Sequence, residues 1–113
     1  MKLPEVIHPQ CAGFDELCSA VWRIARKNIL EDPKAPKTRF MKEGLDRKNF
    51  YFWDTCFMTQ YTRYAPELLP GIETLDKFYS VQRSDGFIPR CFDYATGRQF
   101  GSCPEDVNPP LAA

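Results

Sequence analysis

The sequence has no excess of either charge, no long apolar run and no leader-like N-terminus, and each absence excludes a class of protein. Fifteen basic residues are balanced by fifteen acidic ones, so nothing draws the whole chain toward nucleic acid or an anionic membrane. No stretch approaches the roughly 20 apolar residues of a membrane-spanning helix, and residues 1–10 lack the apolar core of a signal peptide. We therefore expect a cytoplasmic protein with no nucleic-acid and no membrane partner.

Histidine is nearly absent, and the cysteines are irregularly spaced. His8 is the only histidine, and no two cysteines have CxxC spacing. The cysteines are Cys11, Cys18, Cys56, Cys91 and Cys103. A structural zinc site needs four convergent ligands, and an odd cysteine number without a secretion signal is typical of reduced thiols. We expect free thiols, no metal and no cofactor, and we interpret His8 as incidental.

The length of 113 residues allows at most one small domain with a modest core. Residues 34–48 are locally basic, but Glu43 and Asp46 interrupt them, so a solvated loop is favoured over a nucleic-acid site. Residues 31–49 show little periodicity and contain two prolines that cannot continue a helix. They are therefore expected to form a long connection.

Three stretches have the spacing of amphipathic helices. The first spans residues 16–30 and is expected to start from Asp15 as its N-cap. Its apolar stripe contains Leu17, Val21 and Ile24. The second spans residues 54–65, before Pro66, and the third spans residues 71–83. The short link between the second and third predicts an antiparallel helical hairpin.

The C-terminal third has no helical pattern until its last residues. Residues 83–107 are expected to be irregular, with a turn in which Gly86 supplies a positive φ and a short hairpin of residues 91–94 and 98–100. Asn108 and the prolines after it then favour the start of another helix. The predicted fold is mainly α, and its helices expose more apolar surface than they can cover for one another. The chain therefore resembles the first part of something larger.

Residues 50–58, FYFWDTCFM, are the most distinctive stretch. One interpretation is structural: Trp53 belongs to the core, and Asp54 caps the second helix. The other is functional, because aromatic rings cover the C–H faces of sugars while a carboxylate accepts hydrogen bonds from their hydroxyl groups.

The order of several short motifs resembles a known family, the six-hairpin (α/α) barrel glycoside hydrolases. This family includes trehalase, the mannosyl-oligosaccharide glucosidases and mannosylglycerate-hydrolase-like enzymes. Trehalases carry Arg-Phe before Tyr-Tyr-Trp-Asp, and this chain has Arg39-Phe40 before residues 51–54. Their Gly-Phe-Ile-Pro-Asn-Gly segment is answered by residues 86–90 (GFIPR), and their Gln-Pro-Pro by residues 108–110 (NPP). The similarity covers residues 39–113, and its departures from trehalase favour the glucosidase and mannosylglycerate-hydrolase branch.

The resemblance implies a sugar-binding subsite. It assigns Trp53 to stacking on the sugar, Asp54 to accepting from its hydroxyl groups and Asn108 to the pocket wall. The other substrate-binding candidates are Arg90, Gln82, Phe40 and Arg39. Inverting hydrolysis needs two carboxyl groups that flank the scissile bond, and in the family both lie on later hairpins. Glu105 and Asp106 are interpreted as exposed charges.

These observations lead to two hypotheses about function. In the first, residues 1–113 are one partial domain, the N-terminal hairpins of an (α/α)6 barrel, which contributes part of a subsite for a glucoside- or mannoside-like carbohydrate and is inactive alone. In the second, the chain is a small helical protein-interaction module with an aromatic-rich binding face. The sequence does not decide the oligomeric state.

Overall fold

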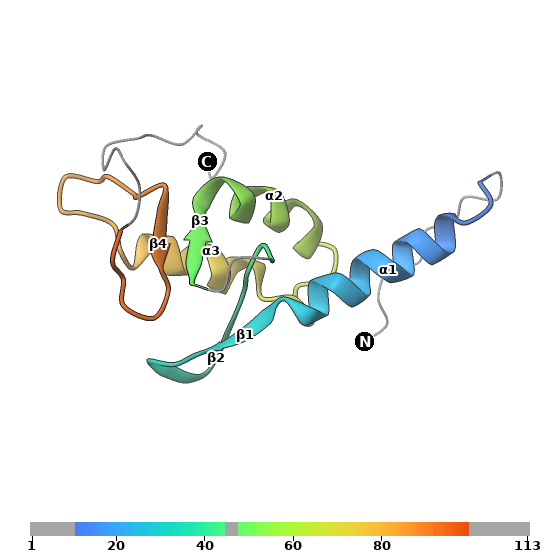
Figure 1. Ribbon diagram of the computed structural model, residues 1–113, viewed down its shortest axis with the longest axis horizontal. Coiled ribbons are helices and arrows are strands. Elements are labelled where there is room, and N and C mark those ends of the chain that lie inside the picture. The colour runs from blue at the N-terminus through green and yellow to red at the C-terminus, as the bar shows by residue number, and fades with distance from the viewer. Residues whose placement is uncertain (1–10, 45–47, 100–113) are drawn as a thin grey trace.

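A computed structural model describes residues 11–44 and 48–99 of the chain. Its elements in chain order are α1 (Phe14–Lys27), β1 (Ile29–Asp32), β2 (Ala35–Met41), β3 (Asn49–Tyr51), α2 (Phe52–Thr62), α3 (Gly71–Tyr79) and β4 (Cys91–Asp93). The strands form two antiparallel pairs, β1 with β2 and β3 with β4. Figure 1 shows α2, α3 and the β3–β4 pair gathered in one body, from which α1 extends to one side.

Helix α1 confirms the first predicted helix but not its predicted cap. The helix begins after Gly13, which adopts a left-handed conformation at φ 84°, a conformation that glycine reaches at little cost. Asp15 lies inside the first turn and makes no capping hydrogen bond. The helix ends at Lys27 because the chain from Ile29 onward forms β1, which pairs with β2.

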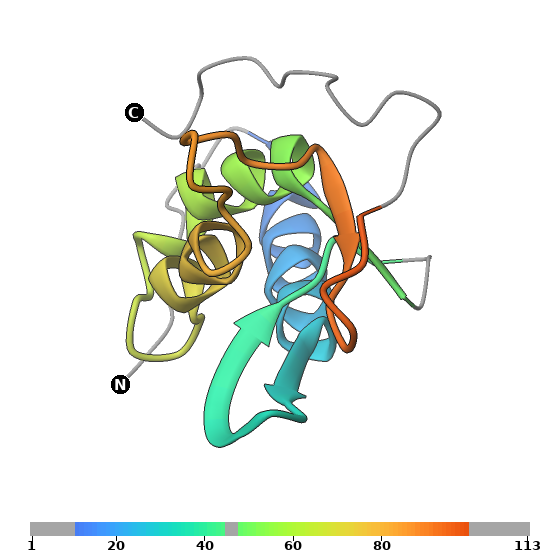
Figure 2. The same cartoon turned by 90° about the vertical axis from the view of Figure 1, so that its left-hand side faces the viewer.

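The β1–β2 hairpin corrects the expectation of an irregular connection over residues 31–49. Leu30 pairs with Phe40, and Glu31 pairs with Arg39. The Lys34 N–H donates to Asp32 Oδ1 over 2.8 Å and closes the turn. Prolines are compatible with turns and with the edges of sheets, and each strand of a two-stranded sheet is an edge. Figure 2 shows this hairpin projecting beyond the helices.

Among the described residues the predicted C-terminal hairpin is reduced to one β-bridge, because β4 pairs with β3 instead. Phe92 does form a bridge with Gln99, as expected for a hairpin of residues 91–94 and 98–100. Its main partner, however, is Phe50 of β3. The Asp93 carboxylate accepts the N–H groups of residues 95 and 96, which closes the turn. Gly86 has the expected positive φ, at 91°. The helix predicted to start at Asn108 lies outside the described residues.

The predicted fold class is wrong. The structure is a small α/β fold with two short antiparallel sheets, not an array of helical hairpins from an (α/α)6 barrel. Helices α2 and α3 do pack together, as expected of the second and third helices, but α3 also packs against β2. The cause is the distribution of phenylalanines, because Phe40, Phe50 and Phe92 are strand residues in the centre of the core.

Two hydrophobic clusters make up the core of the described residues, and β2 contributes one buried residue to each. The ring of Phe78 lies 4.6 Å from that of Phe50 and 5.0 Å from that of Phe92, measured between centroids. The second cluster consists of Ala25, Met41, Met58, Ala65 and Leu69. Successive strand residues point to opposite faces, so Phe40 enters the first cluster and Met41 the second.

Gly71 marks the close approach of α2 and α3. A Cβ atom at this position would lie 2.0 Å from Thr62 Oγ1 and 2.9 Å from Thr62 Cβ. Thr62 is the last residue of α2 and is buried, so its side chain has little room to move. Glycine at the start of α3 is therefore required by packing.

Candidate ligand-binding surface at the start of α2

The first turn of α2 separates the residues of the aromatic stretch into an inner and an outer set. β3 continues directly into α2, and the Phe52 N–H donates to the Arg90 carbonyl oxygen over 2.9 Å. The Phe52 side chain is buried in the core. Trp53 and Asp54, the next two residues, both lie on the outside.

Neither part of the structural interpretation of these residues is correct. Trp53 is 49% exposed and does not belong to the core. Asp54 is the third residue of α2, whose N-cap is Tyr51, and no side chain makes a capping hydrogen bond there. A carboxylate in the first turn still interacts favourably with the helix dipole. Both side chains are nevertheless open to a ligand.

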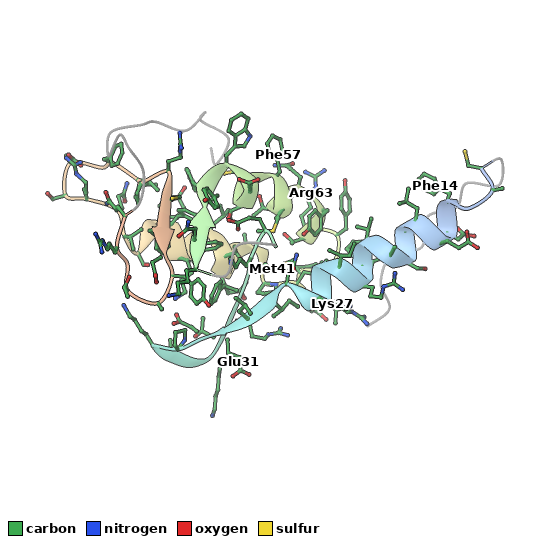
Figure 3. The ribbon with its side chains drawn as sticks, viewed as in Figure 1. Phe14, Lys27, Glu31, Met41, Phe57 and Arg63 are labelled. Carbon is green, nitrogen blue, oxygen red and sulfur yellow. The ribbon has the colours of Figure 1, made fainter. Side chains whose placement is uncertain are left out.

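Trp53 begins an exposed aromatic stripe, which consists of Trp53 and Phe57 on α2 and Tyr64 two residues beyond the end of that helix. The ring centroids of Trp53 and Phe57 are 6.1 Å apart, and the two planes differ by 33°. Phe57 is 56% exposed, and Figure 3 shows it projecting from α2 away from the body. Tyr64 is also exposed, and its hydroxyl accepts from the Arg63 guanidinium over 2.9 Å. Exposed aromatic patches of this kind mark interaction surfaces.

Beneath the start of α2 lies a buried carboxyl group that the sequence interpretation missed. Glu43 Oε1 accepts the N–H of Tyr51, the N-cap of α2, over 2.7 Å. Glu43 Oε2 is buried and has no hydrogen-bond partner among the described residues. Burial raises the pKa of Glu43 from its usual 4.5 to about 7, and the Asp54 carboxylate contributes in the same direction. Glu43 thus supports the helix start through its hydrogen bond, while burial disfavours its charged form.

Lys42, next to Glu43, is buried as well. Its Nζ has no hydrogen-bond partner in the described part of the chain. The sequence interpretation placed both residues in a solvated basic loop, yet they follow directly on the buried Phe40 and Met41 of β2. That run of buried strand residues was the available signal.

The two carboxyl groups near the start of α2 differ in what they can do. The Asp54 side chain is exposed and can accept hydrogen bonds from a ligand. The Glu43 oxygen that lacks a partner is buried, so it cannot reach a ligand on the surface. The arrangement is suited to binding, with Glu43 as a support for the helix that presents Asp54.

The other predicted site residues are distributed over the fold. Arg90 is exposed, and its backbone carbonyl binds the start of α2, which brings it close to Trp53 in the chain fold. Gln82 is exposed at another turn, where its Nε2 donates to the Gly86 carbonyl oxygen over 2.8 Å. Arg39 is exposed on β2. Phe40 has no exposed surface and is a core residue, so its ring is not available to a ligand.

Several predictions fall on parts of the chain that the structure leaves undescribed. Asn108, Glu105, Asp106 and His8 all lie outside residues 11–44 and 48–99. The predicted place of Asn108 in the wall of the sugar-binding pocket therefore stays a prediction.

The described part of the chain also bears on cysteines, metals and membranes. The thiols of Cys11, Cys18 and Cys56 are free. Residues 11–44 and 48–99 contain no group of three or more His, Cys, Asp or Glu side chains that could hold a metal ion. Within the same ranges, none of the helices has the length and apolar character needed to cross a membrane.

Comparisons with known proteins leave the family open. The sequence matches no protein-family model, no curated protein and no solved structure. The resemblance to glycoside hydrolases therefore rests only on the motifs quoted above.

Proposed function

We propose that the surface at the start of α2 binds a carbohydrate, with the Trp53 ring as the platform and the Asp54 carboxylate as the acceptor for sugar hydroxyl groups. The observation that carries the proposal is the adjacent exposure of these two side chains at the first turn of α2. An indole ring left half in water is a site where binding can still remove apolar surface from solvent.

Phe57 adds to the platform. Its ring lies 6.1 Å from that of Trp53 on the same side of α2, so the two rings can cover neighbouring C–H faces of one sugar or of two linked sugars. Asp54 can accept charge-assisted hydrogen bonds, which are stronger than neutral ones. The chemistry fits a neutral glucoside- or mannoside-like ligand rather than an anionic one, because an anion would be repelled by the carboxylate.

The proposal concerns binding and assigns no catalytic step. Hydrolysis would need a second carboxyl group within reach of the same bond, and the neighbouring Glu43 carries its partnerless oxygen in the interior. Glu43 contributes indirectly, because its hydrogen bond to the Tyr51 N–H holds the strand-to-helix junction that presents Trp53 and Asp54.

A second candidate function is protein docking through the same aromatic stripe. It is favoured by Tyr64, which is exposed eleven residues after Trp53. At 1.5 Å per helical residue α2 extends about 14 Å from Trp53 to its end at Thr62, and Tyr64 lies beyond that end, so the stripe is longer than one sugar ring. The two functions can be separated by mutation. Carbohydrate binding should depend on Asp54 and not on Tyr64, whereas protein docking should depend on Tyr64.

The test is a calorimetric titration of the chain with methyl α-glucoside, methyl α-mannoside and their disaccharides. We expect millimolar binding of at least one of them. Trp53→Ala should abolish it, and Asp54→Asn should weaken it about tenfold, which corresponds to the loss of one charge-assisted hydrogen bond. Tyr79→Ala, which removes an exposed aromatic ring from α3, is the matched control and should bind like the wild type.

Two outcomes would contradict the proposal. One is the absence of binding by the folded wild-type chain to every sugar up to about 50 mM, a concentration well above the dissociation constants of weak sugar sites. The other is binding that survives in Trp53→Ala. Sugar binding that Tyr64→Ala abolishes and Asp54→Asn leaves unchanged would contradict the assignment of Asp54 as the acceptor.

A further inference from the structure

Helix α1 presents an apolar face that no described element covers. Leu17 is 60% exposed, Val21 42% and Ile24 56%. Their spacing of four and then three residues places them on one side of the helix. Figure 1 shows α1 extending away from the body, and only Ala25 of this helix is buried. Ala25 lies four residues after Val21, so the contact with the body is made beside the exposed stripe, at one of its edges.

The charges of α1 run from acidic to basic along the helix. Its first turn contains Asp15 and Glu16, and its last turn contains Arg26 and Lys27. On a helical wheel of 100° per residue, Glu16 and Lys27 both lie beside the same edge of the apolar stripe. A copy of the helix that ran in the opposite direction would bring an acidic end opposite a basic end at both ends of the contact. A parallel copy would bring like charges together.

We propose that α1 is the dimerisation element of the protein and pairs through this face with α1 of a second copy in antiparallel orientation. A two-fold axis near Val21 places Leu17 of one copy beside Ile24 of the other. The same axis brings Glu16 of each copy within about one residue of a position opposite the partner's Lys27. A single antiparallel register therefore allows both the apolar contacts between the stripes and the pairing of Glu16 with Lys27.

The dimer formed in this way is weak and concentration-dependent. Fourteen helical residues extend over about 21 Å, so the contact is smaller than the roughly 1,200 Å² of a stable standard interface. We expect a dissociation constant between about 10 μM and 1 mM. The electrostatic pairs are exposed and are screened by salt, so dimerisation should weaken as the ionic strength rises.

The experiment is sedimentation equilibrium of the full chain over a concentration range up to about 1 mM, in reducing buffer so that no thiol contributes. The wild type should fit a monomer–dimer equilibrium. Leu17→Glu should raise the dissociation constant at least tenfold. Ile72→Glu introduces the same charge at an exposed apolar residue of α3 and serves as the matched control. It should leave the constant within about threefold of wild type.

Charge reversal tests the orientation. Glu16→Lys and Lys27→Glu, made separately, should each weaken the dimer about three- to tenfold, because each brings like charges together at both ends of the antiparallel pair. The two changes combined in one chain should restore the wild-type constant to within about threefold. Circular dichroism of each variant confirms that α1 remains helical.

The proposal has clear contrary results. A wild-type chain that remains monomeric at 1 mM overturns it. Dimerisation that Leu17→Glu leaves unchanged, or that Ile72→Glu weakens equally, also overturns it, because the contact would then lie elsewhere. Failure of the double charge reversal to restore dimerisation overturns the antiparallel orientation.

Discussion

The buried carboxyl group of Glu43 makes a specific prediction about the pH dependence of stability. Its pKa in the folded protein is about 7, compared with a usual 4.5. Because the folded state binds this proton more tightly than the unfolded state, Glu43 leaves stability undiminished below about pH 4.5. Stability is then lost as the pH rises through the interval from 4.5 to 7, and the loss is complete above it.

The magnitude follows from the two pKa values. Their difference corresponds to about 3.4 kcal/mol at 1.36 kcal/mol for each pH unit. The Glu43 side chain is only partly buried, and solvent screening reduces such contributions, so we expect a loss of about 2 kcal/mol at pH 8. Glu43→Gln removes the titration and keeps an oxygen that can accept the Tyr51 N–H.

The assay is urea denaturation of wild type and Glu43→Gln at pH 4 and pH 8. The difference between the two proteins cancels the contributions of all other titrating groups. Glu43→Gln should match wild type within about 0.5 kcal/mol at pH 4 and exceed it by about 2 kcal/mol at pH 8. Glu31→Gln on the exposed face of β1 is the control for removing a carboxylate. An equal difference between wild type and Glu43→Gln at both pH values would refute the reasoning.

Three further predictions concern packing and charge, and urea denaturation measures each of them, at pH 7 for all three and also at low pH for Asp32→Asn. Gly71→Ala should destabilise the fold by about 1–3 kcal/mol, because the new Cβ overlaps Thr62, and Thr62→Ala should recover part of that loss. Asp32→Asn should cost about 1 kcal/mol at pH 7 and less at low pH, because the hydrogen bond from Lys77 lowers the pKa of Asp32 and the stabilisation is lost as the pH falls through that pKa. Lys42→Met should stabilise the protein by about 1 kcal/mol, since it removes a buried side-chain nitrogen with no hydrogen-bond partner among the described residues. Each prediction has a contrary result in the free energy of unfolding. These results are no change in Gly71→Ala, an effect of Asp32→Asn that does not depend on pH, and a decrease in Lys42→Met.

The helices were predictable from the sequence because their signal is local. The stripe of Leu17, Val21 and Ile24 has helical spacing, and α1 forms there even though most of this stripe is exposed. The ends of the helices were less predictable. α2 begins at Phe52 rather than Asp54 because β3 runs directly into it, and that junction depends on β4, which is 40 residues away in the chain.

β1, β2 and β3 were missed because their signal is not local, whereas the segment that forms β4 was predicted to be extended. β2 contains Pro36 and alternates charged residues with apolar ones only briefly, so the periodicity of a strand is weak. Its partner β1 was divided between two expected elements: residues 29 and 30 were assigned to the first helix, and residues 31 and 32 to the connection after it. Phe40 lies in one cluster and Met41 in the other, and β2 packs against α3. Because α3 is about 30 residues away in the sequence, the local pattern around β2 does not contain this information.

The candidate site was predictable in part. The chemistry of Trp53 and Asp54 singled them out, and both are exposed on α2. Phe40 was assigned to the site by motif order alone, and burial removes it. The role of Glu43 could not be foreseen, because its elevated pKa depends on burial and on the Asp54 carboxylate, which only the folded chain brings near.

The central claim, that Trp53 and Asp54 form a carbohydrate-binding surface, is tested most directly by the two tryptophan side-chain N–H signals in a ¹⁵N–¹H NMR titration. Trp53 is half exposed, whereas the indole nitrogen of Trp22 is buried and its ring lies against Tyr61, so Trp22 serves as an internal control. The account predicts that a glucoside or mannoside shifts the Trp53 signal with a saturable, millimolar dependence and leaves the Trp22 signal in place. Equal shifts of both signals, or no shift of Trp53 up to about 50 mM sugar, would contradict it.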